Sequence, residues 1–322
     1  MILTVTINPL LEKVLYFKSL NEFSANRSYK EELKAGGKGI NVSRQLNYLG
    51  VENLTFTFLG GNNGKDLRST LTKEGINFTA IASKSETRWG TVIHNENDNS
   101  IKSYFSPNQE LTEKEVTDFI AKLEKVIPNH SIIVLSGSSP CKEADRIFPA
   151  AIEIANNEDK IVVLDTYGDH LEECLKAAPT VVHNNVDEVE NSLSINLKED
   201  ESKIDFLNNL YDKGVKLSFL TEGGKPFYSS KFDFNYKIFP KQVIVKDATG
   251  SGDAFTAGIV YGLHYSFVFD EFTKIAAALG SLNAESFDTC KVDKEKAMHL
   301  SASIEIESIG KRMKLIDDSP NY

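Results

Sequence analysis

Residues 245–258 read VKDATGSGDAFTAG, with two glycines between a short β-branched run and an apolar run rich in helix formers. Because Gly250 and Gly252 lack a Cβ atom, the backbone can turn sharply there and approach a ligand closely. If a helix begins at this point, the amides of Gly250, Ser251 and Gly252 lie at its positive end and face outward. The stretch therefore predicts an anion site at the start of a helix.

Asp253 is the unusual residue of this stretch, because a carboxylate beside a bound phosphate is unfavourable unless it takes part in chemistry. A carboxylate base next to an anion site suits the transfer of a phosphoryl group to a hydroxyl. A glycine turn followed by an acidic residue in the first helical turn is the alternative explanation. The stretch alone leaves both explanations open.

A succession of strand, glycines and helix recurs along the whole chain and is typical of βα units. The pattern predicts strands at residues 2–7, 54–59, 132–135, 161–164, 180–182 and 217–220, and helices at 43–49, 66–75, 113–126, 145–156, 253–263 and 272–284. Edge strands at 227–228 and 234–239 follow, then a helix after Lys291 and a polar end. Continuous apolar strands indicate a parallel sheet covered on both faces, and ligands bind at the carboxyl ends of such strands.

Two stretches depart from this pattern. Residues 88–105 read as a β-hairpin with a polar turn at 95–99, and residues 14–17 and 27–33 read as short strands. We expect the strands from about 14–33 and 88–106 to form a small sheet that covers the active site as a lid or pairs with another subunit as a homodimer. No repeat or low-complexity linker divides the 322 residues, which predicts a single domain, 1–322, with this lid inserted in it.

The composition argues against several classes of protein. A net charge of −10 argues against a nucleic-acid partner and an anionic membrane partner, and no apolar run reaches the length of a membrane span. The first nine residues lack the features of a signal peptide, and the three cysteines lack C-x-x-C spacing, which favours a reducing cytoplasm. The six histidines show no metal-ligand spacing, and we interpret them as surface or packing residues.

Two common nucleotide-binding motifs are absent from the sequence. A Walker A loop needs G-x-x-x-x-G-K-[ST], which neither residues 36–39 nor residues 61–66 match. A dinucleotide fingerprint needs three glycines after the first strand, whereas residues 250–252 come late in the chain and lack the third glycine. The sequence therefore argues against a dehydrogenase.

Two motifs at opposite ends of the chain, GGKG at residues 36–39 and DATGSGD at residues 247–253, resemble those of the PfkB (ribokinase-like) family of sugar kinases. The stretches between them agree in order and spacing, so the resemblance covers roughly residues 1–300. Similarity to the phosphosugar branch, with 1-phosphofructokinase and tagatose-6-phosphate kinase, lies in residues 4–9, 26–27, 86–88 and 135–138. The resemblance implies a ribokinase-like α/β three-layer sandwich with a mostly parallel central sheet and a small β-sheet lid.

The resemblance also implies roles for the late motif. Asp253 would act as the general base that takes the proton of the sugar hydroxyl as its oxygen attacks the γ-phosphorus of ATP. The amides of Gly250, Ser251 and Gly252 would hold the charge that develops on the transferred group.

Arg27, Lys38 and Arg88 would bind the phosphate of the acceptor, although each taken singly could be a solvated surface charge. Asn41 would bond a sugar hydroxyl, or else cap the following helix. Glu12 stands where the family generally has Asp, and its extra methylene would shift the sugar or select another one. Gly37 and Ser138 complete the predicted substrate site.

For the nucleotide, Asn185 and Glu188 would organise Mg²⁺, through water, and the phosphates of ATP. The family usually has Lys-Pro where this chain has His183-Asn184. The predicted ATP-binding residues are Asn185, Thr221, Gly223, Gly250, Gly252 and Asn283. Asn283 lies where the family packs the adenine, with a helix-surface amide as the alternative.

The sequence thus predicts an ATP- and Mg²⁺-dependent phosphosugar kinase, with fructose 1-phosphate preferred to tagatose 6-phosphate and fructose 6-phosphate. A kinase of an unphosphorylated sugar is the neighbouring alternative, against which Arg27 and Arg88 count because a neutral sugar offers them no partner. A sugar-phosphate sensor that lost its activity is the third interpretation, which the intact residues 250–253 disfavour.

Overall fold

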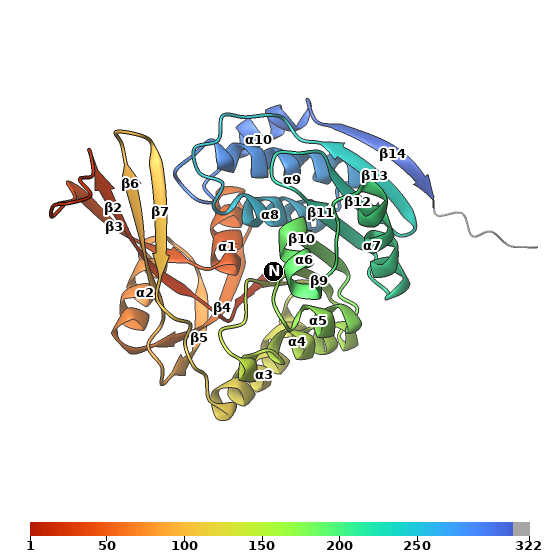
Figure 1. Ribbon diagram of the computed structural model, residues 1–322. Helices are drawn as coiled ribbons and strands as arrows, with labels where there is room; N and C mark the ends of the chain where they lie inside the picture. Colours follow the sequence, from red (N-terminus) through yellow and green to blue (C-terminus); the bar gives the residue numbers. More distant parts are fainter. Residues whose placement is uncertain (312–322) are drawn as a thin grey trace, which may run out of the picture.

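A ten-stranded sheet runs through the middle of the molecule in the computed structural model, which describes residues 1–311 (Figure 1). Its order is β14-β13-β12-β11-β10-β9-β8-β1-β4-β5. Seven strands are parallel: β1 (Ile2–Thr6), β4 (Asn53–Gly60), β5 (Phe78–Ser83), β8 (Ile132–Ser136), β9 (Ile161–Asp165), β10 (Val181–Asn185) and β11 (Leu217–Thr221). The antiparallel edge consists of β12 (Phe227–Lys231), β13 (Phe234–Phe239) and β14 (Glu305–Lys311).

Helices cover both faces of this sheet. The helices are α1 (Lys38–Tyr48), α2 (Gly61–Lys73), α3 (Glu113–Val126), α4 (Ile147–Asn157), α5 (Leu171–Lys176), α6 (Val186–Leu193), α7 (Asp200–Asp212), α8 (Ser251–His264), α9 (Phe269–Ala284) and α10 (Lys294–Ser301). Because side chains alternate along a strand, Leu3 and Ile133 join the core under α3–α7, whereas Ile2 and Ile132 join the core under α1 and α8–α10. The predicted three-layer arrangement is confirmed.

A second sheet of four strands, the lid, projects from the main body (left in Figure 1). Its order is β3-β2-β6-β7, with β2 (Leu10–Phe17), β3 (Lys30–Gly36), β6 (Trp89–Asn95) and β7 (Ser100–Phe105). β2 pairs antiparallel with β3 and parallel with β6. The strand predicted at 27–33 begins three residues later, so residues 27–29 lie in the loop at the outer end of the β2–β3 hairpin.

The two late helices pack closely through small residues, as their composition predicts. A Cβ atom at Gly258 of α8 would lie only 2.5 Å from the Cα atom of Ala276 of α9. This close approach fixes where α8 begins and where α9 ends, on either side of the predicted anion site.

The sequence pattern missed several elements. Strand β5 and the helices α5, α6 and α7 were not predicted, and α1 begins at Lys38 because Gly37, at φ 118°, turns the chain there. The β-branched run at 243–245 forms no strand, and Ile244 is 83% exposed. Residues 305–311 form β14, whereas the polar end beyond them lies outside the described residues. Within residues 1–311, none of the helices has the length and apolar character needed to cross a bilayer.

Candidate active site

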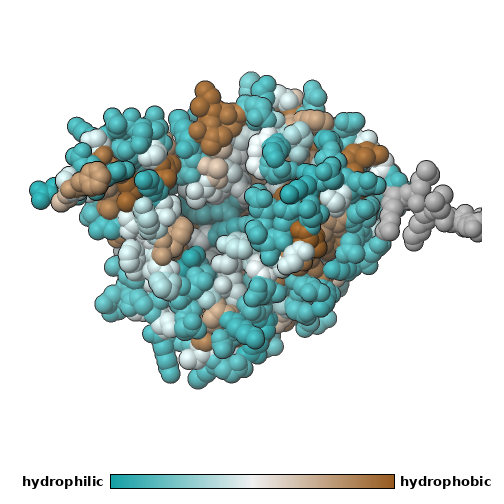
Figure 2. Space-filling view, viewed as in Figure 1, coloured by the Kyte–Doolittle hydropathy of each residue, from teal (hydrophilic) through white to brown (hydrophobic). Residues whose placement is uncertain are grey.

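A cleft of about 600 Å³ opens at the carboxyl ends of the parallel strands, where open α/β sheets bind ligands. Figure 2 shows this face hollowed near its centre, between the lid and the helices of the main body. Residues from many elements and loops converge on it. They include Gly37, Lys38 and Asn41, Arg88 before β6, Asn185, Thr221 and Gly223, Gly250–Asp253, and Ala277, Gly280, Ser281 and Ala284 of α9.

The late glycine motif forms the predicted helix start. Helix α8 begins at Ser251, and Gly250 precedes it with φ 79°, a left-handed conformation that favours glycine. The amide of Ser251 donates to the carbonyl of Ala248 at 3.1 Å. In the part of the chain that is described, the amides of Gly250 and Gly252 have no acceptor. Two of the three predicted donors are therefore free to meet an anion.

Asp253 lies in the first turn of α8 and is only 4% exposed. Nδ2 of Asn41 donates a 2.7 Å hydrogen bond to its Oδ2 atom. Burial raises the pKa of Asp253 to about 7, although the nearby Lys38 ammonium opposes the rise. A carboxylate with this pKa can accept a proton at neutral pH and is matched to general base catalysis.

Asn41 is held so that its amide nitrogen faces Asp253. Its Oδ1 atom accepts a 2.6 Å hydrogen bond from Arg44, whose guanidinium pairs in turn with Glu74 at 2.7 Å. The residue that precedes α1 is Gly37, so Asn41 is not a helix cap, and that alternative is wrong.

Lys38 lies between two carboxylates. Its Nζ atom is 2.9 Å from Oδ1 of Asp165 and 2.7 Å from Oε1 of Glu188. Burial alone would lower the pKa of Lys38, but the two carboxylates outweigh it and raise that pKa, so the side chain is an ammonium. The same ammonium holds the pKa of the buried Asp165 below its usual range. Asp165 was not predicted as part of the site. Its only signal in the sequence was its position at the end of a predicted strand.

Residues 185–188, N-x-x-E, form a capping box at the start of α6, which fixes the orientation of the Glu188 side chain. Oδ1 of Asn185 accepts from the amide of Asp187 at 2.9 Å, and Oε2 of Glu188 accepts from the amide of Asn185 at 3.2 Å. This reciprocal pair fixes the start of α6. It leaves Oε1 of Glu188 facing the cleft, where it pairs with Lys38.

His183 lies against the cleft, and its interpretation as a surface or packing residue missed this. The side chain is buried, with Nδ1 2.8 Å from Oγ1 of Thr256 and Nε2 3.2 Å from Oγ1 of Thr221. The hydroxyl of Thr256 donates to Oδ2 of Asp165 at 3.0 Å, so it accepts from Nδ1–H of His183. His183 therefore helps to position Asp165 through the hydroxyl of Thr256. The only sequence signal was its position near the end of a strand.

Arg88 lines the cleft, and Ser138 lies beside it, joined to Arg88 through Asn8. The guanidinium of Arg88 donates to the carbonyl of Asn8 at 3.2 Å and contacts Oδ1 of Asn108 at 3.5 Å. Nδ2 of Asn8 donates to Ser138 and to Asn108, both at 3.1 Å. Ser138 and Tyr167 also line an adjoining cavity of about 570 Å³. Asn8 and Asn108 were not predicted, and they position the two residues that were.

The family model described as "pfkB family carbohydrate kinase" matches residues 12–296 of this chain. The chain belongs to that family. Similar relatives include the tagatose-6-phosphate kinase of Staphylococcus epidermidis, 30% identical over 312 residues, which cover 95% of this chain and 99% of the relative. The 1-phosphofructokinase of Borreliella burgdorferi is 29% identical over 308 residues, which cover 95% of this chain and 98% of the relative.

Among solved structures, the tetrameric inhibited form of phosphofructokinase-2 from Escherichia coli superposes with a TM-score of 0.85 at 20% identity. The match covers 94% of this chain and 98% of that one and confirms the ribokinase-like fold. A carbohydrate kinase of this family is a phosphotransferase that acts on an alcohol group. ATP is its substrate.

Four predicted site residues of this pfkB kinase lie outside the residues that line the cleft, and one of them is Ser138, which lines only the adjoining cavity. Arg27 is exposed in the outer loop of the lid, at the opposite end of β2 from Leu10, which lines the cleft. Glu12, on β2, faces Gly36, and burial raises the pKa of its carboxyl. Asn283 is buried behind the late glycine motif.

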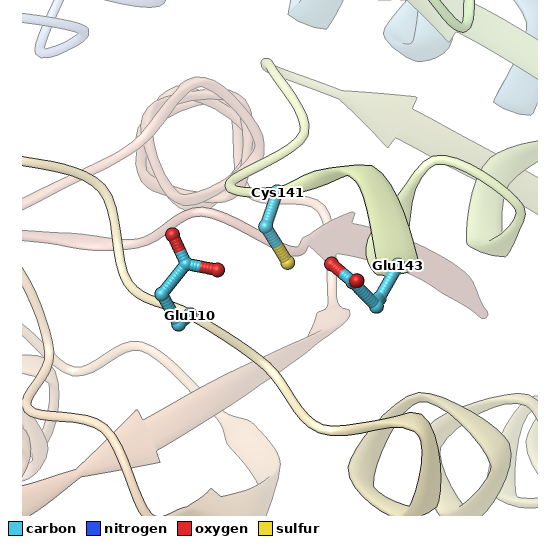
Figure 3. Close-up of side chains that lie close together, drawn as sticks. All are labelled: Glu110, Cys141 and Glu143. Atoms are coloured by element: carbon cyan, nitrogen blue, oxygen red, sulfur yellow. The ribbon is translucent and has the colours of Figure 1, made fainter.

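A cluster of Glu110, Cys141 and Glu143 lies beside the adjoining cavity of the pfkB kinase (Figure 3). Their side-chain ligand atoms all lie within 4.8 Å of one another. Burial raises the pKa of the Cys141 thiol, whose sulfur accepts from the amide of Leu111 at 3.4 Å. A thiol that stays protonated is a poor metal ligand, and exposed carboxylates are common without an ion, so these three residues give no basis for a metal centre.

Proposed function

We propose that the protein is an ATP-dependent phosphosugar kinase that transfers the γ-phosphoryl group to a ketohexose phosphate. Fructose 1-phosphate, which would give fructose 1,6-bisphosphate, is the first candidate acceptor, and tagatose 6-phosphate and fructose 6-phosphate are the next. One observation carries the proposal: a buried carboxylate, Asp253, lies beside the free amides of Gly250 and Gly252 in a cleft that Arg88 also lines. The names of the two relatives support the same substrate class.

The geometry supports a direct transfer. The acceptor hydroxyl gives its proton to Asp253 while its oxygen forms a bond to the γ-phosphorus, and the bond from that phosphorus to the bridging oxygen of ADP breaks. The amides of Gly250 and Gly252 hold the negative charge on the transferred group. Asn41 keeps the base oriented. Because the transition state is loose, most of the acceleration comes from positioning and charge stabilisation.

The acceptor phosphate is proposed to bind Arg88 and Ser138. Arg88 offers a planar pair of donors that suits a phosphate, and it is already held by Asn8 and Asn108. Gly37, Lys38 and Asn41 line the same cleft and are proposed to contact the sugar. Glu12 is proposed to act on the sugar through its contact with Gly36, because its carboxyl lies against that residue.

The nucleotide phosphates are proposed to bind at Thr221, Gly223 and the late glycines, and Mg²⁺ at Asn185 and Glu188 through water. Glu188 lines the cleft with a carboxylate oxygen, the kind of ligand that Mg²⁺ prefers, and shares it with the Lys38 ammonium. Oδ1 of Asn185 already caps α6, which favours an indirect contact. When bound, Mg²⁺ would neutralise charge on the nucleotide phosphates.

We also propose that two copies of this single-domain kinase form a homodimer through their lids. We place the protein in a reducing cytoplasm, where all three free cysteines stay reduced. Exposed aromatic side chains on the lid support the dimer: Trp89, Tyr104 and Phe105 are 50%, 57% and 56% exposed. A contact of Arg27 with an acceptor would then come from the lid of a second copy. Sedimentation of the wild type and of Trp89→Glu tests this, and a monomeric wild type contradicts it.

The test of the function is kcat/KM with ATP for the three phosphosugars and for unphosphorylated fructose and tagatose. We expect a phosphosugar to be preferred by at least a hundredfold, because a neutral sugar leaves the Arg88 charge without a partner. Equal or better turnover of an unphosphorylated sugar contradicts the proposal. Binding of a phosphosugar without turnover would indicate a sensor instead.

A further inference from the structure

The side chain of Asn283, near the end of α9, donates both of its amide hydrogens to the late glycine motif. It is 1% exposed and does not line the cleft. Its Nδ2 atom donates to the carbonyl of Thr249 at 2.9 Å and to the hydroxyl of Ser251 at 3.2 Å. Its Oδ1 atom accepts from the amide of Cys290 at 2.7 Å. The first two partners stand directly on either side of Gly250.

Other contacts from the same end of α9 hold the rest of this loop. The carbonyl of Ala284 accepts from the amides of Lys246 and Asp247 at 2.7 and 3.2 Å. The thiol of Cys290, which Asn283 holds in place, donates to the carbonyl of Gly250 at 3.3 Å. The carbonyl of Thr249 thus faces α9, and the carbonyl of Gly250 accepts from Cys290 and, at 2.8 Å, from the amide of Ala254 in α8. Gly250 and Gly252 line the cleft, and their amides have no acceptor within the described residues.

We propose that Asn283 is a positioning residue for the anion site, which sets the two free amides for the transferred phosphoryl group without touching the substrate. This inference rests on the proposed function. Donors that are fixed before the reaction stabilise developing charge without reorganisation, and loss of a single donor of this kind costs about 10²–10³ in kcat. Glycine adopts positive and negative φ about equally, so the left-handed conformation of Gly250 depends on its neighbours, and Asn283 bonds the residues on both sides of it.

The chemistry of the amide explains why this position needs asparagine. Three partners require two donors and one acceptor on a short side chain, which an amide supplies. The isosteric change Asn283→Asp removes both donors and places a carboxylate against the carbonyl oxygen of Thr249. The role is also distinct from the adenine contact predicted for Asn283, which would act on ATP binding and not on turnover.

The experiment compares the wild type with Asn283→Asp and Asn283→Ser, with Gln45→Ala as the matched control. Gln45 is also a fully buried amide, and it bonds both the amide and the carbonyl of Val292 at 2.9 Å, close to the same segment but away from the glycines. Kinetics with ATP and a phosphosugar, per titrated active site, give kcat and both KM values. Hydrogen exchange by mass spectrometry reports the amides of residues 246–255 without any need for turnover.

We expect kcat to fall at least thirtyfold in both Asn283 variants, with KM for the acceptor changed less than threefold and faster exchange confined to residues 246–255. We expect Gln45→Ala to lower the melting temperature but to keep kcat within threefold of the wild type. A large rise in KM for ATP at unchanged kcat would overturn the inference in favour of an adenine contact. Equal losses in Gln45→Ala would reduce Asn283 to a structural role.

Failure of the proposed function gives a different result. In that case the wild type phosphorylates none of the sugars, and the exchange comparison alone decides the inference. If Asn283→Asp does not fold, Asn283→Ser keeps the measurement available. Unchanged exchange at residues 246–255 in either folded variant overturns the inference whatever the substrate.

Discussion

The change Asp253→Asn tests the assignment of the base through both activity and stability. Asparagine keeps the shape of the side chain and can still accept the 2.7 Å hydrogen bond from Asn41, but it cannot take a proton. We expect kcat to fall by about 10²–10⁴, the usual contribution of a general base. Because burial raises the pKa of Asp253 to about 7, we also expect wild-type kcat/KM to fall about tenfold per pH unit below that value.

The effect on stability has a definite sign. A carboxyl group whose pKa is raised from 3.8 in the unfolded chain to about 7 in the folded one binds its proton more tightly when folded. Its contribution is therefore full at acid pH and is lost as the pH rises toward 7. Each pH unit between 5 and 7 removes about 1.4 kcal/mol, so the loss over that window approaches about 3 kcal/mol. Asp253→Asn escapes this loss.

Thermal unfolding of the wild type and Asp253→Asn at pH 5 and pH 8 measures the difference. The variant should gain more stability at pH 8 than at pH 5, by up to about 5 °C in Tm for a chain of this size. Asp118→Asn is the control, because Asp118 is exposed on α3 with Lys114 as its partner. A wild-type rate that is flat from pH 5.5 to 8, or a variant with wild-type kcat, would refute the reasoning.

Three further changes test other parts of the molecule. Arg88→Ala should raise KM for the phosphosugar at least tenfold and leave KM for ATP within threefold, since we propose that this guanidinium binds the acceptor phosphate and not the nucleotide; steady-state kinetics measures both. Glu188→Gln keeps a side chain that can cap α6 but removes a charge, so the Mg²⁺ concentration needed for half-maximal activity should rise several-fold in a Mg²⁺ titration at fixed ATP. Gly258→Ala should lower the free energy of unfolding by about 1–3 kcal/mol, because the new Cβ would lie 2.5 Å from Cα of Ala276; denaturant unfolding measures it, and an unchanged midpoint would contradict the packing argument.

The sheet and its principal helices could be predicted from the sequence because their signals are local. Buried parallel strands such as β8 are continuous apolar runs, and glycines mark where α1 and α8 begin. Strand β5, FTAIAS, was missed because it is only partly buried and has no apolar run of this kind. Helices α6 and α7 were missed because polar and charged residues dominate their exposed faces and their apolar positions are few.

The candidate site divides in the same way. Residues inside the two glycine motifs were predicted, because both the spacing and the chemistry of each motif are contiguous in the sequence. Asp165, His183 and Thr256 were not, since their link to the site is a chain of hydrogen bonds between three elements that are far apart in sequence. Asn283 was assigned to the site, but only its contacts show that its amide faces the glycine loop and not the cleft.

The charge balance of the cleft follows from one residue, Lys38. Three carboxylates, those of Asp165, Glu188 and Asp253, surround a single ammonium, which holds Asp165 ionised. That compensation is incomplete for Asp253, because burial and the two other carboxylates raise its pKa more than Lys38 lowers it. The pKa of Asp253 therefore depends on an ion cluster whose cation, Lys38, belongs to the early glycine motif. A cation bound beside Glu188 would lower that pKa, whereas the negative phosphates of a nucleotide would raise it.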